Sequence, residues 1–243
     1  MPEGPSIIIA REDIERFTGK KILSASGSSK INMDRLVNNK IVEIRTWGKH
    51  LLLCFRGFTL RVHFLMFGKY LINSSKPLKS RLSLKFSNGQ ELNFYTSAIK
   101  EIEEPLDEIY DWTADIMNDQ WNPAAAKKKM QAAGDKLIAD VLMDQQIFSG
   151  LGNIIKNEVL YRARVHPKSI TQNIPSSRIN IILTEVKTYV FEFLLYKKAY
   201  VLAAHWEVYT KKKCPRDGAA IRKEYIGTQQ RRCFFCDQCQ VVY

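Results

Sequence analysis

The cysteines most strongly limit what this chain can fold into. Four of the five cysteines lie within the last thirty residues, and Cys236-x2-Cys239 has the spacing of a zinc knuckle. The sequence Cys214-Pro-Arg-Asp217-Gly has the shape of a second knuckle whose last ligand is a carboxylate. We therefore predict a zinc-finger β-hairpin over residues 211–243, with one structural Zn²⁺ held by Cys214, Asp217, Cys236 and Cys239.

Cys233 keeps a second ligand set open, because zinc also binds four thiolates. About thirty residues bury too little apolar surface to fold alone, so the metal would supply the missing stability. The alternative is a small hairpin with spare thiols and no metal. The odd number of cysteines, after a start (MPEGP) without a signal-peptide core, argues against disulfides, and we expect a cytoplasmic, nucleoid-associated protein.

The charge balance indicates a polyanionic partner. The formal net charge is +12 and the pI is near 9.5, and such a field attracts nucleic acid above all. A membrane surface would also attract it, but the chain has no run of eighteen apolar residues and no basic amphipathic anchor. We expect a DNA-binding protein that acts as a monomer and has no membrane partner.

The N-terminal half has the pattern of a β-structure. Apolar and polar residues alternate over 58–64 and 82–86, with turn residues between the runs. The pattern extends over 40–95, and a predicted helix over 7–17 precedes it. Short strands of this kind suit a sandwich or barrel, and we predict that residues 1–112 form a β-sandwich domain.

The second half of the sequence has the pattern of a helical domain. An acidic, aromatic stretch without periodicity contains the predicted linker, residues 113–122. The predicted helical domain covers 123–210, and the apolar stripe of its longest helix consists of Ile179, Ile182, Leu183, Val186, Val190, Phe193 and Leu194. The fold class is therefore α+β with two domains, a β-sandwich and a helical domain that carries the zinc-finger hairpin.

Two shorter helices are predicted over 136–147 and 153–163, joined by a tight turn over 148–152 that contains two glycines. Asn153 then lies where a helix N-cap belongs, beside free backbone N–H groups at the positive end of a helix. This position suits one DNA phosphate, and an ordinary helix cap is the alternative interpretation.

The start of the chain carries a candidate nucleophile. If Met1 is removed, Pro2 presents a secondary amine that titrates near about 8, so a useful fraction is unprotonated at neutral pH. Attack of this amine on C1′ of a deoxyribose would give an iminium ion, which permits loss of the base and β-elimination of the 3′ phosphate. Glu3 would transfer the protons. In isolation the same pentapeptide would be an ordinary flexible chain start.

Taken in order, these features resemble the formamidopyrimidine-DNA glycosylase and endonuclease VIII family over nearly the whole chain. The stretch from Asp144 to Asn153, followed by Asn157-Glu158 and by 163–167, looks like the helix-two-turn-helix signature of that family. The resemblance implies a β-sandwich with a catalytic N-terminal helix, then a helix-two-turn-helix domain with a hairpin. It also implies a base-excision repair enzyme, a DNA glycosylase and abasic-site lyase. Such an enzyme excises oxidised bases from double-stranded DNA through a Schiff base on the N-terminal proline and cleaves the strand by β- or β,δ-elimination.

The resemblance assigns roles to further residues. Lys49 matches a strand lysine that touches phosphate and serves in β-elimination. Arg231 matches the hairpin arginine that binds phosphate and assists δ-elimination, and Arg232 is a close competitor. Glu158 matches a glutamate near the catalytic amine, where the alternative is a helix-surface acid.

The segment from His63 to Gly68 resembles the family loop that fills the space left by a flipped-out nucleotide. Met66 is the predicted wedge, and a core methionine is the alternative. The predicted DNA-binding residues are therefore Lys49, His63, Met66, Asn153, Glu158 and Arg231.

Within the family, MPEGP in place of MPELP favours the endonuclease VIII branch and oxidised pyrimidines as substrates. Two departures stand out: Ser6 replaces a glutamate of the catalytic pocket, and Asp217 replaces a zinc cysteine. A catalytically inactive lesion- or structure-specific DNA-binding protein is therefore the alternative function, and a zinc-ribbon transcription regulator ranks third.

Overall fold

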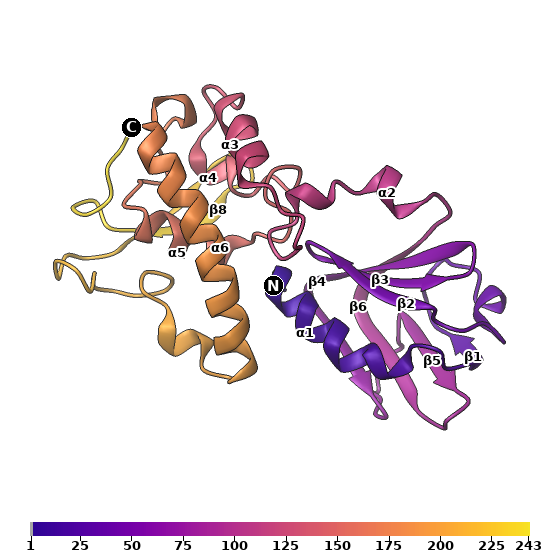
Figure 1. Ribbon diagram of the computed structural model, residues 1–243. Coiled ribbons are helices and arrows are strands. Elements are labelled where there is room, and N and C mark those ends of the chain that lie inside the picture. The colour runs from indigo at the N-terminus through magenta and orange to yellow at the C-terminus, as the bar shows by residue number, and fades with distance from the viewer. Residues whose placement is uncertain (1) are drawn as a thin grey trace. The chain divides into compact units, whose positions relative to one another are not determined.

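The computed structural model describes residues 2–243, so Met1 lies outside the described residues. The chain divides into two units, Met1–Tyr110 and Asp111–Tyr243, each with its own hydrophobic core (Figure 1). The segment predicted as a linker, 113–122, belongs to the second unit, because Ala114 and Ile116 are buried and the Ile116 N–H donates to the Ser149 carbonyl at 3.1 Å. Its one aromatic residue, Trp121, is partly buried and packs against the core of that unit.

The first unit is a β-sandwich built from one antiparallel sheet of order β1-β5-β6-β4-β3-β2. Its strands are β1 (Ile22–Ser26), β2 (Glu43–Trp47), β3 (His50–Phe55), β4 (Phe58–Ile72), β5 (Leu82–Phe86) and β6 (Glu91–Ile102). The pairing of the long strands β4 and β6 is interrupted between Phe64 and Lys69, which divides the sheet into two halves. The apolar side chains of both halves form one core, as the predicted sandwich requires.

Helix α1 (Gly4–Ile14) packs on β2 and β3 within this unit. It begins before the predicted residue 7, because Pro5 suits the first turn, where its fixed φ is favourable and no N–H is needed. A short 3₁₀ turn, Glu15–Phe17, continues it to the predicted end. Short helical segments at Asp34–Leu36 and at α2 (Leu106–Ile109) complete the unit.

The second unit is helical and ends in a hairpin. It contains a 3₁₀ turn at Trp112–Ala114, α3 (Pro123–Gln131), α4 (Ile138–Val141), α5 (Asn153–Arg162), a 3₁₀ turn at Thr171–Asn173, α6 (Ser176–Lys198), a 3₁₀ turn at Leu202–His205, β7 (Arg222–Ile226) and β8 (Arg231–Phe235). Six of the seven predicted stripe residues of α6 are buried. Helix α5 packs against α6 and β8 (Figure 1), so the hairpin belongs to the helical unit.

The predicted helix over 136–147 is wrong, because the structure keeps only α4, a single turn. The Asp144 carboxylate accepts the Gln146 N–H at 2.9 Å, and the Gln145 amide donates to the Met143 and Leu151 carbonyls. Side-chain bonds of this kind compete with the helical backbone bonds and turn the chain toward the glycine turn. Among the described helices, none combines the length and the apolar character that a bilayer crossing demands.

Candidate active site and metal centre

Pro2 and Glu3 lie at the start of α1. Pro2 is half-buried, and only 1% of Glu3 is exposed. The Glu3 backbone is extended, and its carbonyl accepts the Ser6 N–H at 2.8 Å, which begins the helix. A carboxyl group is seldom buried so completely on a plain chain start, so this segment is not the flexible terminus that the pentapeptide alone would indicate.

Lys49 lies in a two-residue turn between the paired residues Trp47 and His50. Gly48 takes the left-handed conformation that this tight turn needs (φ 53°), and a side chain there would be strained. The lysine is half-buried. It therefore sits on a rigid hairpin tip of the unit that also holds Pro2 and Glu3.

Two histidines neighbour this lysine. His50 and His63 face each other across β3 and β4, with ring centroids 5.5 Å apart, and His50 Nδ1 lies 3.2 Å from the Tyr110 hydroxyl. Burial, with the nearby cations Arg61 and Lys49, lowers the pKa of His50 to about 3. Burial and the same two cations also lower the pKa of His63. Both rings are therefore neutral at neutral pH, and any phosphate contact of His63 would be an uncharged hydrogen bond.

Met66 lies where the β4–β6 pairing is interrupted. The side chains of Leu65, Met66 and Phe67 are 45%, 54% and 74% exposed, so the alternative of a core methionine is wrong. Gly68 closes this bulge, because a Cβ there would lie 2.9 Å from both the Phe64 Cα and the Thr96 carbonyl oxygen. Three adjacent apolar side chains are thus presented to solvent on a tightly fixed backbone.

Asn153 is the first residue of α5, and Gly152 is the N-cap, so the prediction of Asn153 as N-cap is wrong. The extended backbone of Gly152 takes the cap position. The Asn153 Nδ2 donates to the Arg232 carbonyl at 2.9 Å, and Asn157 Nδ2 reaches the same oxygen at 3.3 Å. The start of α5 is therefore tied to β8, and contact of Asn153 with a phosphate stays a prediction.

Glu158 is completely buried in the second unit. Its carboxylate accepts the backbone N–H groups of Glu207, Val208 and Tyr209 at 2.9, 3.1 and 2.8 Å. The structure thus contradicts both the predicted DNA contact and the alternative of a surface acid. The carboxylate stabilises the segment after α6, a contact that helical periodicity cannot reveal.

We expect Glu158→Gln to lower the free energy of unfolding by about 1–3 kcal/mol, because one amide donor then faces a backbone N–H. Burial raises the pKa of Glu158, against the opposing effect of the three N–H groups. The pKa of Glu158 is thus higher in the folded state than in the unfolded state, where it is about 4.3, so this group stabilises the fold at pH values below the unfolded-state pKa. The contribution is lost as the pH rises through the folded-state pKa. Urea unfolding from pH 4 to 8 should therefore show the largest gap between wild type and variant at acid pH; a gap independent of pH would contradict this.

Arg231 begins β8, and its Nε lies 3.4 Å from the Gln229 Oε1. Strand alternation places Arg231 and Cys233 on one face and the exposed Arg232 on the other. Cys233 is buried, and its Sγ accepts a bond from Lys156 Nζ at 3.1 Å. Cys233 therefore stands outside the group of metal-ligating atoms that the described residues form.

The four predicted metal ligands come together beside the hairpin. The donor atoms of Cys214, Asp217, Cys236 and Cys239 all lie within 4.8 Å of one another. The Cys214 and Cys239 sulfurs are 3.9 Å apart, and Cys236 Sγ lies 3.2 Å from an Asp217 oxygen. A tetrahedral zinc with bonds of about 2.3 Å to sulfur needs ligand separations of about 3.8 Å, so this donor set fits a single metal ion.

Two residues that the sequence did not single out flank the cluster. The Tyr161 hydroxyl lies 3.2 Å from Cys214 Sγ, and the Arg216 guanidinium reaches Cys239 Sγ at 3.9 Å and the Tyr161 carbonyl at 2.7 Å. Three thiolates and a carboxylate around a divalent ion would carry a net negative charge, which Arg216 would offset. The position of an arginine between two ligands of the first knuckle is the signal that could have indicated this role.

Comparison with known proteins finds a match to a known domain family in each of the two units. The formamidopyrimidine-DNA glycosylase N-terminal domain matches residues 1–97, and the H2TH domain of the same glycosylases matches residues 113–199. Endonuclease 8-like 2 of Homo sapiens is 33% identical over 199 residues, 76% of this chain and 58% of that protein. Endonuclease 8-like 3 of Bos taurus is 28% identical over 216 residues, 81% of this chain and 34% of that protein. The chain thus spans at most about three-fifths of these relatives.

Solved structures agree on the fold. A viral DNA glycosylase has a TM-score of 0.85 at 23% identity and covers 98% of this chain and 100% of its own. The Lactococcus lactis formamidopyrimidine-DNA glycosylase, bound non-covalently to DNA with an abasic site, has a TM-score of 0.85 at 24% identity over 98% and 99%. The fold is thus that of a DNA glycosylase. The chain belongs to the formamidopyrimidine-DNA glycosylase and endonuclease VIII family, and its curated relatives are endonuclease 8-like proteins.

Proposed function

We propose that this protein is a DNA glycosylase of base-excision repair that removes oxidised bases and then cleaves the strand at the abasic site. The observation that carries the proposal is the buried Glu3 carboxyl group beside Pro2 at the start of α1, in a chain whose two units both match the family. The net charge of +12 supports a DNA partner, and the protein would act as a monomer on double-stranded DNA.

The proposed reaction begins once Met1 is removed, because an amide nitrogen has no free electron pair. The Pro2 nitrogen attacks C1′, and the glycosidic bond breaks with its electron pair going to the base, which takes up a proton. Glu3 then protonates O4′, the C1′–O4′ bond opens, and an iminium ion joins Pro2 to C1′.

Strand cleavage follows from the same adduct. The iminium ion accepts electrons, so the C2′ proton becomes acidic; its removal breaks the C3′–O3′ bond and releases the 3′ phosphate. Lys49 on its hairpin tip would bind a phosphate beside the lesion, and Arg231 would bind the phosphate whose departure completes δ-elimination. Hydrolysis of the imine regenerates Pro2.

We further propose that the ion of the cysteine cluster is zinc with a structural role. Three thiolates and one carboxylate are a donor set that zinc prefers over magnesium or calcium, and the full set of four ligands leaves no open position for catalysis. Cys214, Asp217, Cys236 and Cys239 would hold it, and the ion would fix the hairpin that presents Arg231.

Incision of defined duplexes tests the function. Substrates with thymine glycol, dihydrouracil, 5-hydroxycytosine, 8-oxoguanine or an abasic site should be compared, and we expect the oxidised pyrimidines and the abasic site to be cut faster than 8-oxoguanine. The 3′ ends of the products distinguish β- from β,δ-elimination. Lesion-selective binding without any incision would favour the inactive DNA-binding protein instead.

We predict that Met66→Ala lowers incision of base lesions several-fold while leaving thermal stability unchanged. The side chain is more than half exposed, so its loss creates no cavity, but an apolar wedge stabilises the gap left by an extruded base. Leu23→Ala is the matched control, because it removes an equally exposed apolar side chain of the same unit that lies outside the bulge. Equal activity of Met66→Ala and wild type on every lesion would refute the wedge.

A further inference from the structure

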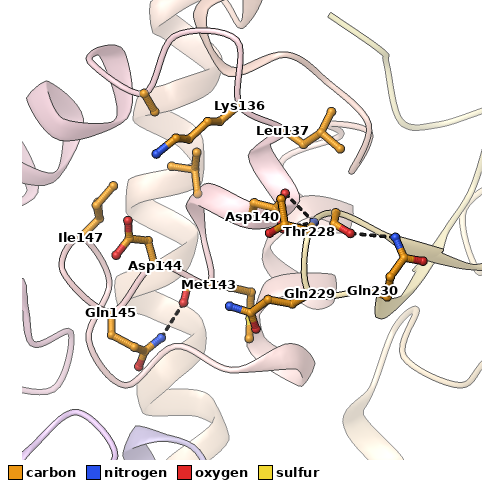
Figure 2. A pocket seen from close by; sticks show the side chains of 13 residues that line it. Lys136, Leu137, Asp140, Met143, Asp144, Gln145, Ile147, Thr228, Gln229 and Gln230 are labelled. Atoms are coloured by element: carbon orange, nitrogen blue, oxygen red, sulfur yellow. Dashed lines mark hydrogen bonds between the residues drawn. The ribbon is translucent and has the colours of Figure 1, made fainter.

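The turn between β7 and β8, residues 227–230, closes one side of a groove of about 880 Å³ in the second unit (Figure 2). The other side is formed by α4 and the residues around it, from Lys136 to Ile147. Arg231 follows this turn directly. In this groove the helical part of the unit therefore contacts the turn that leads into the proposed phosphate-binding residue, Arg231.

Asp140 of α4 points across the groove at the turn, as Figure 2 shows. Its two carboxylate oxygens lie 3.1 and 3.0 Å from the Thr228 nitrogen, whose N–H they accept. The preceding residue, Gly227, has a φ of +83°, and a Cβ on it would lie 2.7 Å from the Asp140 Cγ. Only glycine therefore allows the turn both this backbone conformation and this close approach of the carboxylate.

Hydrogen bonds within the turn connect the position that Asp140 fixes to Arg231. The Gly227 carbonyl accepts the Gln230 N–H at 3.1 Å and its side-chain Nε2 at 2.8 Å, which fixes the turn internally. Gln229 then accepts the bond from Arg231 Nε. On the same face of β8, Cys233 packs in a small apolar cluster with Ala139, the residue before Asp140. Contacts from α4 thus hold both the turn and the strand that carry the arginine.

We propose that Asp140 is a positioning residue, which holds the β7–β8 turn so that the Arg231 guanidinium is presented to a DNA phosphate. The inference rests on the proposed function of Arg231. A carboxylate beside a DNA phosphate would by itself repel it, so the hydrogen bond that Asp140 accepts from the turn is the role that favours binding.

The test compares Asp140→Ala, Asp140→Asn and Arg231→Ala in the full chain, with Asp135→Ala as a control that removes an exposed carboxylate of the same segment. The probe is a duplex with a tetrahydrofuran abasic analogue, and the readout is the dependence of its affinity on salt. Loss of one phosphate contact should reduce the slope of log K against log salt by about 0.9. We expect this reduction for Arg231→Ala and Asp140→Ala, and wild-type slopes for Asp135→Ala and for Asp140→Asn, whose amide oxygen still accepts the Thr228 N–H.

The double variant D140A/R231A should show the slope of Arg231→Ala alone, because Asp140 acts through the arginine. On a natural abasic site, Asp140→Ala should lose δ-elimination product but keep the borohydride-trapped adduct. An unchanged slope for Asp140→Ala, or additive losses in the double variant, overturns the inference. If Asp140→Ala does not fold, Gly227→Ala displaces the turn from the other side and should give the same slope. If wild type forms no adduct, the proposed function fails, while the salt slopes still decide the role of Asp140.

Discussion

A chain that keeps one extra glycine before Pro2 should form no borohydride-stable adduct with abasic DNA and should lose incision by roughly 10³-fold or more. The added residue turns the Pro2 nitrogen into a tertiary amide, whose electron pair is delocalised and cannot attack C1′. The new amine belongs to the glycine before Pro2, so it is one residue farther from the buried Glu3 that would protonate O4′.

The measurement is covalent trapping, followed by mass-spectrometric mapping of the modified residue. The control is the same chain after the glycine has been removed, so that only the amide bond differs. Binding of the extended chain to the tetrahydrofuran duplex should be retained, because Lys49 and Arg231 are untouched. Full trapping in the extended chain, or an adduct that maps to a lysine, would contradict the proposed nucleophile.

Much of the fold could be predicted because periodic patterns report burial. The stripe of α6 and the alternating residues of β4 and β5 face the cores as expected. Strand β1 was missed because only Ile22 among its residues is buried, so it carries no alternation. The division between the units lies before the predicted linker, because Ile116 belongs to the core of the second unit and Trp121 packs against it, and neither shows a periodic pattern in the sequence.

The site was predictable where chemistry depends on spacing and not where it depends on long-range contacts. Four metal ligands in two short knuckles are visible in the sequence, and the structure gathers the same four. Glu158 and Asp140 instead bind backbone N–H groups 49 and 88 residues away. Backbone donors have no sequence signature, so a buried carboxylate that binds them looks like any helical acid.

Removal of the metal should unfold the hairpin and abolish tight DNA binding. Zinc binding to small domains of this kind contributes about 10–16 kcal/mol, and in such segments the binding energy is folding energy. The hairpin includes β8, which is bonded to α5 through Asn157 and Lys156, so its loss would also expose the α5 face. Chelation should therefore lower the melting temperature and weaken binding to abasic-analogue DNA, and added zinc should restore both.

Single-residue variants assign the ligands. We expect one zinc per chain in wild type, none in Cys239→Ser or Asp217→Ala, and tighter binding in Asp217→Cys, because thiolate is the softer ligand. Cys233→Ser and Cys54→Ser are matched controls, since the sulfur of each lies outside the cluster. Zinc content by atomic absorption after dialysis against a chelator separates these outcomes. Loss of zinc in Cys233→Ser together with its retention in Asp217→Ala would show that the all-cysteine set binds the ion, and the carboxylate beside Cys236 would then be a surface acid.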